Sequence, residues 1–202
     1  MTPTSEADAA ARRADHEIEP LFLKRWSPRA FDGSALDPPT LASILEAGRW
    51  APSASNVQPW RFVYAVRGEA DWARFLALLK PNNAAWAQNA GALVFICSDT
   101  EKPATDLAPA QLSRSHSFDA GAAWAFMALQ ATALGLHAHA IGGFDHERAH
   151  VELQVPDRFR VEAAVAIGRT GDRARLPEAL QARERPSTRR PLAETAFRGR
   201  FR

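Results

Sequence analysis

Hydrophobic and polar residues follow helical spacing in some parts of the chain and form strand-like runs in others. Residues 38–50 place Leu41 and Ile44 on one face at helical spacing, which predicts an amphipathic helix with prolines in its first turn. The same patterns predict further helices over residues 69–79, 83–89 and 177–183. Strands are predicted over residues 60–66, 90–98, 136–141 and 161–168.

The longest apolar stretch is Phe118–Leu134, which is apolar on nearly every side. Such a pattern is typical of a buried helix rather than a surface helix. Helical and strand patterns are interspersed, with no internal repeat. We therefore expect a single α+β domain over residues 18–202, with a mixed, mostly antiparallel sheet flanked by helices and a C-terminal arm. Residues 1–17 are small and polar, and we expect them to be disordered or frayed.

The composition of the 202 residues argues against several classes of protein. The 25 basic and 23 acidic residues leave a net charge of only +2, which gives no general attraction for nucleic acid. No apolar run reaches transmembrane length, and the N-terminal residues lack the apolar centre of a signal peptide. The single cysteine, Cys97, falls in a buried-strand pattern and excludes a disulfide framework within the chain. We expect a cytoplasmic protein with no nucleic-acid or membrane partner.

The segment after the first helix has an unusual composition for a loop. Residues 51–60 read A-P-S-A-S-N-V-Q-P-W and carry no charge. Asn56 and Gln58 each offer a donor next to an acceptor, which matches the edge of a pyrimidine-like ring. The loop therefore suits a planar heterocycle. An equally good alternative is a plain helix-terminating loop stiffened by Pro52 and Pro59.

A second short segment, Arg25-Trp26-Ser27-Pro28-Arg29, places two guanidinium groups and a hydroxyl at alternate positions. In an extended backbone these side chains share one face. Arginine can form forked hydrogen bonds to phosphate oxygens, and serine can add a donor. Taken alone, this pattern is also compatible with a solvated arginine-rich loop.

In this order and at this separation, the two segments resemble the nitroreductase family of FMN-dependent flavoproteins. The resemblance runs from about residue 21 to 192. Three later segments extend it: Phe118–Ala123 at the start of the long helix, Ile141–Asp145 and Thr188–Leu192. One departure is Trp26, where relatives usually carry Arg or His. It affects only the contacts of that middle side chain.

The resemblance implies FMN as cofactor and names the residues around it. Arg25 and Ser27 would hold the phosphate, together with Arg189 or Arg190. The other cofactor-binding residues would be Trp26, Arg29, Pro52, Ser53, Ala54, Ser55, Asn56, Gln58, Asn83, Gly142 and Gly143. For Asn83, a helix N-terminal cap is an equally good interpretation.

Two of these residues would take part in the reaction. The resemblance places the backbone N–H of Gly143 opposite flavin N5, and Arg29 near the pyrimidine edge, where it would stabilise negative charge on the reduced flavin. It also implies a homodimer in which the Pro52–Pro59 loop approaches the flavin of the partner subunit.

The implied reaction is a ping-pong oxidoreduction. NADH or NADPH would deliver hydride to FMN and leave, and a flat electrophile such as a nitroaromatic or a quinone would then take its place. Within the family, a specialised flavin dehydrogenase or dehalogenase is the alternative. A non-catalytic flavin- or nucleic-acid-binding module is a further one.

Another motif points elsewhere. Residues 146–150 read H-E-R-A-H, which matches the H-E-x-x-H signature of zinc metalloproteases. His146 and His150 would share a helix face with Glu147 as base, and Glu162 could supply a third ligand. Because the motif opens a short helix with polar flanks, we expect no metal site. His137 and His139 alternate on a predicted strand, where they could face substrate or simply pack.

Overall fold

A computed structural model of the chain describes residues 12–106 and 109–201. Its central sheet has four strands in the order β1-β2-β6-β5, and each neighbouring pair is antiparallel. The strands are β1 (Trp60–Val66), β2 (Ala92–Asp99), β5 (His137–Ile141) and β6 (Phe159–Gly168). Each lies within two residues of its predicted limits. The expected α+β fold, with an antiparallel sheet flanked by helices, is confirmed.

Apart from α2 (Pro20–Lys24), which was not predicted, the helices occur close to where the sequence predicts them. They are α3 (Pro38–Arg49), α4 (Trp72–Ala77), α5 (Pro81–Ala87), α6 (His116–Ala133), α7 (His146–Glu152) and α8 (Glu178–Gln181). Short 3-10 turns are η1 (Ala54–Asn56), η2 (Arg173–Arg175) and η3 (Leu192–Glu194). A small ribbon of β3 (Glu101–Lys102) and β4 (Gln111–Leu112) lies between β2 and α6 in the sequence.

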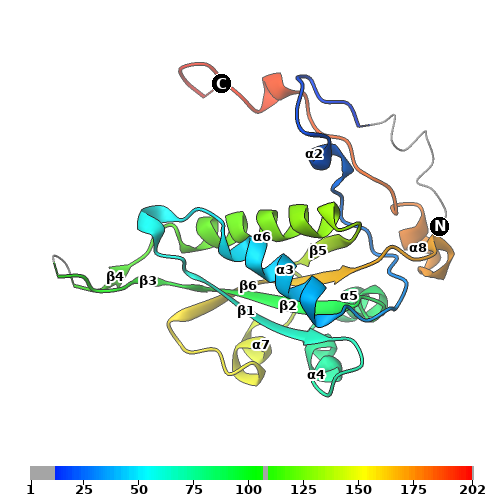
Figure 1. The fold of residues 1–202 in the computed structure, drawn as a ribbon, viewed down its shortest axis with the longest axis horizontal. Helices are drawn as coiled ribbons and strands as arrows, with labels where there is room; N and C mark the ends of the chain where they lie inside the picture. Colours follow the sequence, from blue (N-terminus) through cyan, green and yellow to red (C-terminus); the bar gives the residue numbers. More distant parts are fainter. Residues whose placement is uncertain (1–11, 107–108, 202) are drawn as a thin grey trace.

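The helices form one layer on each side of the sheet (Figure 1). α3 and α6 cover one face, and α4, α5 and α7 lie on the other. β2 has both faces buried, which explains its continuous apolar run. α3 approaches α6 closely at Gly48, where a Cβ atom would lie 2.7 Å from Cγ of Met127.

The prediction for residues 69–79 was too long at both ends. The chain first makes a turn in which the Glu69 carboxylate accepts from the backbone N–H of Val66. After α4, Leu79 leaves the helix to pair with Phe144. A tertiary contact therefore ends the helix before its apolar pattern does.

The long helix α6 is buried on one side only. Ala123 and Met127 are fully buried against the core, whereas Phe118 is 83% exposed and Phe126 40% exposed. The apolar residues that predict a fully buried helix thus leave a hydrophobic strip uncovered in the single chain.

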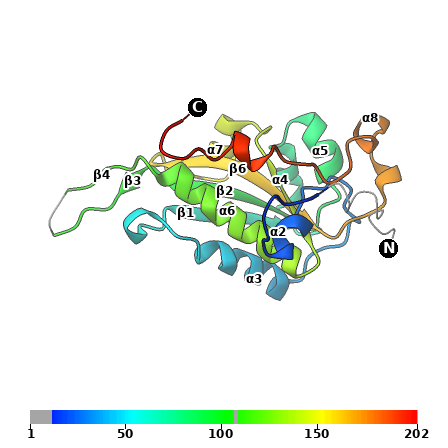
Figure 2. The same ribbon diagram turned by 90° about the horizontal axis from the view of Figure 1, so that it is seen from above.

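The N-terminal and C-terminal segments lie side by side over α6 (Figures 1 and 2). The backbone N–H of Leu192 donates to the Asp15 carboxylate at 2.7 Å. Of the segment predicted to be frayed, residues 1–11 lie outside the described residues. Within residues 12–106 and 109–201, no helix has the length and apolar character needed to cross a membrane.

Candidate functional site

Three arginines from distant parts of the sequence gather beside α2. Arg25 Nη1 lies 3.2 Å from Ser27 Oγ, so these alternate residues share a face as expected. Arg12 donates to the carbonyl oxygens of Leu23 and Arg25 at 2.7 and 2.8 Å. Burial and the charge of Arg189 lower the pKa of Arg25, and burial with the charges of Arg189 and Arg25 lowers the pKa of Arg12.

This arginine cluster (Arg12, Arg25 and Arg189) has an excess of positive charge. In the described part of the chain, none of the three forms an ion pair with a carboxylate. Guanidinium groups that repel one another are stabilised when an anion binds between them. The cluster is therefore suited to a phosphate group.

A cleft of about 460 Å³ opens next to Arg25 and Ser27. It combines a wall of apolar residues from α6 with a few polar groups, which is typical of a small-molecule site. The lining residues are Phe22, Arg25, Ser27, Trp124, Ala125, Ala128, Leu129, His139 and Ala140.

Both histidines of β5 are packed near this cleft. Nδ1 of His139 lies 2.9 Å from the carbonyl oxygen of Pro28, which can only accept, so Nδ1 carries the hydrogen. Burial lowers the pKa of His139 to about 4, against the hydrogen bond to Pro28, and the charge of Arg29 acts in the same direction as burial. Burial also lowers the pKa of His137, whose ring meets Trp26 edge-on at 5.8 Å. Both imidazoles are therefore neutral at pH 7.

Arg29 is held by a buried acid from the C-terminal part of the chain. Oε1 of Glu184 accepts from the backbone N–H groups of Arg29 and Ala30 at 2.7 and 2.8 Å. Oε2 of Glu184 lies 4.0 Å from Nη1 of Arg29. Glu184 has no local signature in the sequence, because its partners are more than 150 residues away.

The Pro52–Pro59 loop has a strained backbone. Ser55, Asn56 and Gln58 have φ angles of 53°, 55° and 53°, a left-handed region that residues other than glycine rarely adopt. Each such residue costs on the order of 1 kcal/mol, and residues of this kind concentrate at functional sites. The side chains of Asn56 and Gln58 are exposed, which leaves their amide groups accessible to a ligand.

Contacts to α6 and within the loop hold this strained shape. The backbone N–H of Gln58 donates to Ser53 Oγ at 3.0 Å. The backbone N–H of Ala54 donates to the carboxylate of Asp119, which also accepts from Ser115 Oγ. Pro52 is exposed at the start of the loop. Asp119 is buried and was not identified from the sequence.

Within one chain, the loop and the arginine cluster do not meet. The loop lies at the α6 end nearest β3 and β4, whereas α2 lies toward the other end (Figures 1 and 2). An 18-residue helix is about 27 Å long. A ligand that contacts both segments would have to take them from two different chains.

Gly142 and Gly143 follow β5 and have different surroundings. A Cβ atom on Gly142 would meet no atom within 4 Å, whereas one on Gly143 would lie 2.4 Å from Nδ2 of Asn83. That amide donates to the Gly143 carbonyl at 2.9 Å, so the interpretation of Asn83 as a helix cap is wrong. Among the described residues, the Gly143 N–H has no hydrogen-bond acceptor.

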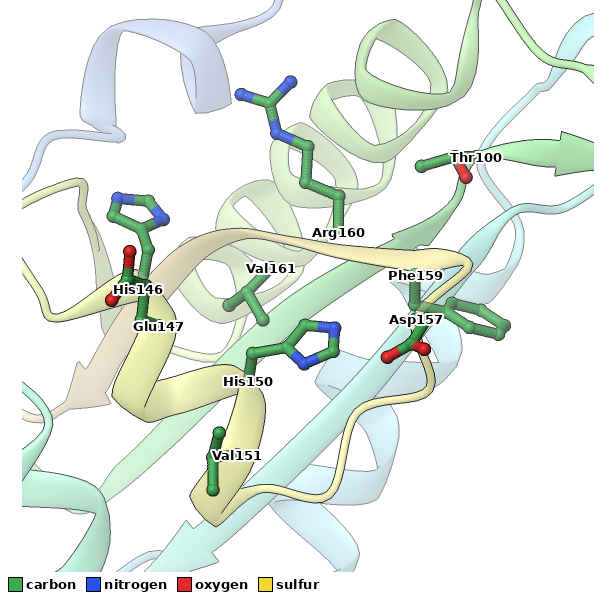
Figure 3. Close-up of a pocket in the computed structure, with 9 residues that line it drawn as sticks. All are labelled: Thr100, His146, Glu147, His150, Val151, Asp157, Phe159, Arg160 and Val161. Carbon is green, nitrogen blue, oxygen red and sulfur yellow. The ribbon is translucent and has the colours of Figure 1, made fainter.

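A larger cleft, of about 600 Å³, contains the H-E-x-x-H motif (Figure 3). It lies beside α7, on the opposite face of the sheet from α6. The imidazoles of His146 and His150 point in different directions, and His150 is turned toward Asp157. In the part of the chain that the structure describes, no three His, Cys, Asp or Glu side chains are placed to hold a metal ion.

Glu162, the third ligand considered for such a metal, is on the wrong side of the sheet. A β-bulge opposite Ile96 and Cys97 turns it toward α6. There its Oε1 accepts from Ser98 Oγ at 2.6 Å and from Ser117 Oγ at 2.7 Å. The H-E-x-x-H match therefore has no third ligand at this position.

Comparison with known proteins identifies the family of this chain. A model of the nitroreductase family matches residues 23–169, which is well over half of the chain. The chain belongs to the nitroreductase family. The family assignment makes it an oxidoreductase.

Known proteins match the chain over most of its length. A crystal structure of an oxidoreductase containing FMN has 50% sequence identity and a TM-score of 0.91, and covers 95% of this chain and 96% of that one. A candidate nitroreductase from Desulfovibrio desulfuricans, solved with FMN, has 27% identity and a TM-score of 0.69 over 92% of this chain and all of its own. An uncharacterised 15.4 kDa protein of Mycolicibacterium smegmatis is 35% identical over 70% of this chain and 97% of its own length.

The two arginines considered for the phosphate, Arg189 and Arg190, are placed differently in the structure. The charge of Arg189 acts on Arg25, whereas Arg190 is exposed and has no recorded contact with the cluster in the described residues. Arg12 was missed, because it lies in the segment expected to be frayed. Its only signal in the sequence is a basic residue ahead of α2.

Proposed function

We propose that this chain is an FMN-dependent oxidoreductase that takes electrons from NADH or NADPH. The observation that carries the proposal is the arginine cluster, whose three guanidinium groups have no carboxylate partner among the described residues. It adjoins a mainly apolar cleft next to the Ser27 hydroxyl. A single phosphate attached to a flat ring system fits both features.

The residues near the cleft then have separate tasks. Arg12, Arg25, Ser27 and Arg189 bind the phosphate, and the apolar residues of α6 contact the rest of the cofactor. When bound, FMN supplies the redox chemistry, because it can accept a hydride from a nicotinamide and pass electrons to an acceptor. The backbone N–H of Gly143 is free to donate to the ring, and the Asn83 amide holds the Gly143 carbonyl in place.

The proposal includes a homodimer with two shared sites. The exposed strip of α6 and the separation of the Pro52–Pro59 loop from the arginine cluster both support it. Arg29 of one chain and Asn56 of the other would then approach the same cofactor. Obligate dimer interfaces commonly exceed about 2,000 Å², which would cover the α6 strip.

The proposed acceptors are flat electrophiles, namely nitroaromatics and quinones. A relative from Rhodopseudomonas palustris is named a candidate NADH dehydrogenase/NAD(P)H nitroreductase, at 28% identity over 80% of this chain and 89% of its own. Activated alkenes belong in the same assay panel, because a Lactiplantibacillus plantarum relative over 47% of this chain is named an enone reductase. A ping-pong mechanism predicts parallel double-reciprocal lines when donor and acceptor are varied together.

The decisive test compares FMN with riboflavin, which has the same ring and no phosphate. Apo protein titrated by flavin fluorescence should bind FMN at least tenfold more tightly than riboflavin, because charge-assisted hydrogen bonds to the phosphate each contribute about 1.5–3 kcal/mol. Equal affinities, or no binding of either flavin, would overturn the proposal. Stopped-flow bleaching of the bound flavin by NADH and by NADPH then identifies the donor.

A further inference from the structure

We propose that Glu184 is a positioning residue that sets the redox potential of the bound cofactor by holding Arg29 and partly neutralising its charge. The inference rests on the proposed function, since it concerns the same cofactor site. It assigns a role to a residue that belongs to none of the sequence motifs.

Glu184 is placed in an unusual way for a carboxylate. Its side chain is only 3% exposed, although burial of a charge is costly unless the charge is paired. Oε1 accepts hydrogen bonds from the backbone N–H groups of Arg29 and Ala30. Oε2 is buried and has no hydrogen-bond partner among the described residues. Among the described residues, the Arg29 guanidinium, 4.0 Å away, is the one cation within ion-pair distance of this carboxylate.

The charge of Arg29 is felt on the cleft side as well. It contributes to lowering the pKa of His139, and His139 lines the cleft beside Arg25 and Ser27. The residue before Arg29, Pro28, contacts His139 directly through its carbonyl oxygen, so Arg29 is near both the buried Glu184 and a residue that lines the cleft. Oε2 of Glu184 and the Arg29 guanidinium are 4.0 Å apart and form no hydrogen bond, so Glu184 reduces the field of the guanidinium without fully cancelling it.

This arrangement affects reduction because reduction changes the charge in the cleft. A flavin that accepts two electrons and one proton becomes one unit more negative. A negative charge near the site disfavours that product, and a positive charge favours it. At the effective dielectric constant of a protein site, a unit charge roughly 10 Å away changes such an equilibrium by about tenfold. Glu184 should therefore hold the potential lower than Arg29 alone would set it.

The substitution Glu184→Gln separates this role from a structural one. Glutamine keeps an oxygen that accepts from both backbone N–H groups, so the segment 29–30 stays in place, but the charge is lost. In FMN-loaded protein, the midpoint potential should become more positive, by about tenfold in the reduced-to-oxidised equilibrium or about 30 mV for two electrons. The fold-change in the dissociation constant for oxidised FMN should be smaller than the tenfold change in the reduced-to-oxidised equilibrium.

Two further variants make the result specific. Glu178→Gln removes a charge from the exposed start of α8 and should leave the potential unchanged. If Glu184 acts only by its own charge, the charge effects add and the shift should be the same in an Arg29→Gln background, measured at saturating FMN. If it also acts by positioning the Arg29 guanidinium, the shift should be smaller there. An equal shift in both backgrounds would overturn the assigned route.

The outcome also distinguishes this inference from the proposed function. A protein that fails to bind FMN contradicts the proposed function, whatever the Glu184 variants do. A protein that binds FMN, folds as Glu184→Gln, and keeps the wild-type potential contradicts the role of Glu184 alone. Should Glu184→Gln unfold, Glu184→Asp provides the second arm: it keeps the charge, and the potential should then stay near the wild-type value.

Discussion

Two short motifs in this chain match known signatures, and the structure treats them very differently. R-x-S-x-R at residues 25–29 is a loose pattern, yet Arg12 and Arg189 join it from both ends of the chain. H-E-x-x-H at residues 146–150 is a complete match, yet among residues 12–106 and 109–201 no third ligand is placed beside it. A functional site is formed by groups that converge from separate elements. The residues that surround a motif in space therefore decide its function more than the completeness of the sequence match does.

The surroundings of the histidines repeat this difference. His139 is packed under the segment that carries Arg25 and Ser27, and its pKa is lowered to about 4. His146 and His150 line an open cleft on the other face of the sheet (Figure 3). The R-x-S-x-R motif and His139 are thus packed against the rest of the fold, whereas the H-E-x-x-H motif lies at the surface.

The largest effect is expected from breaking the arginine cluster. Arg25→Ala should weaken FMN binding by about 10–100-fold, because a charge-assisted hydrogen bond contributes about 1.5–3 kcal/mol. Riboflavin binding should hardly change, because the lost partner is the phosphate. Flavin fluorescence titration measures both. A parallel loss for both flavins would mean that Arg25 supports the fold rather than the phosphate.

The next effect concerns His139 and pH. Its pKa is about 4 in the folded state and about 6.5 when unfolded, so the unfolded state binds more protons between these values. Stability should therefore fall as the pH drops through this window, by roughly 2 kcal/mol between pH 7 and pH 5. His139→Asn keeps an N–H donor for Pro28 and should lack this component in urea unfolding. Identical pH dependence in both proteins would contradict the buried, neutral histidine.

A mixing experiment tests whether the loop reaches the cluster of a second chain. Arg29→Ala and Asn56→Ala should each weaken FMN binding in both sites of a symmetric dimer. After subunit exchange, half of the dimers are mixed and each has one intact site, so about a quarter of all sites should recover. Wild-type protein mixed with itself controls for losses during exchange. No recovery despite confirmed exchange would place both residues on the same site within one chain.

The smallest effect is expected at the H-E-x-x-H motif. The double substitution of His146 and His150 by alanine should leave FMN affinity and donor oxidation unchanged, and stability within about 0.5 kcal/mol per site. Metal analysis of the purified wild-type protein should find no stoichiometric zinc. One zinc per chain, lost together with activity on chelation, would reverse the comparison between the two motifs.

The sequence by itself determined the elements and the family. Apolar periodicity reports which side of each segment is buried, so β1, β2, α3 and the α+β class could be predicted from it. The order and spacing of the motifs pointed to the nitroreductase family, which the family match confirms. The sequence correctly predicted a long apolar helix at α6. Periodicity alone could not show that part of its apolar surface stays uncovered in a single chain.

The tertiary structure decided which residues meet. Glu184 lies beside Arg29, Asp119 anchors the Pro52–Pro59 loop, and Arg12 joins Arg25 and Arg189. None of these contacts has a local signature, because each links residues that are far apart in the sequence and are brought together only by the fold. The sheet also placed Glu162 on the face away from His146 and His150, because a single bulge reverses the direction of one side chain. Local chemistry is written in the sequence, whereas the electrostatics of the site arises from which distant charges the fold brings together.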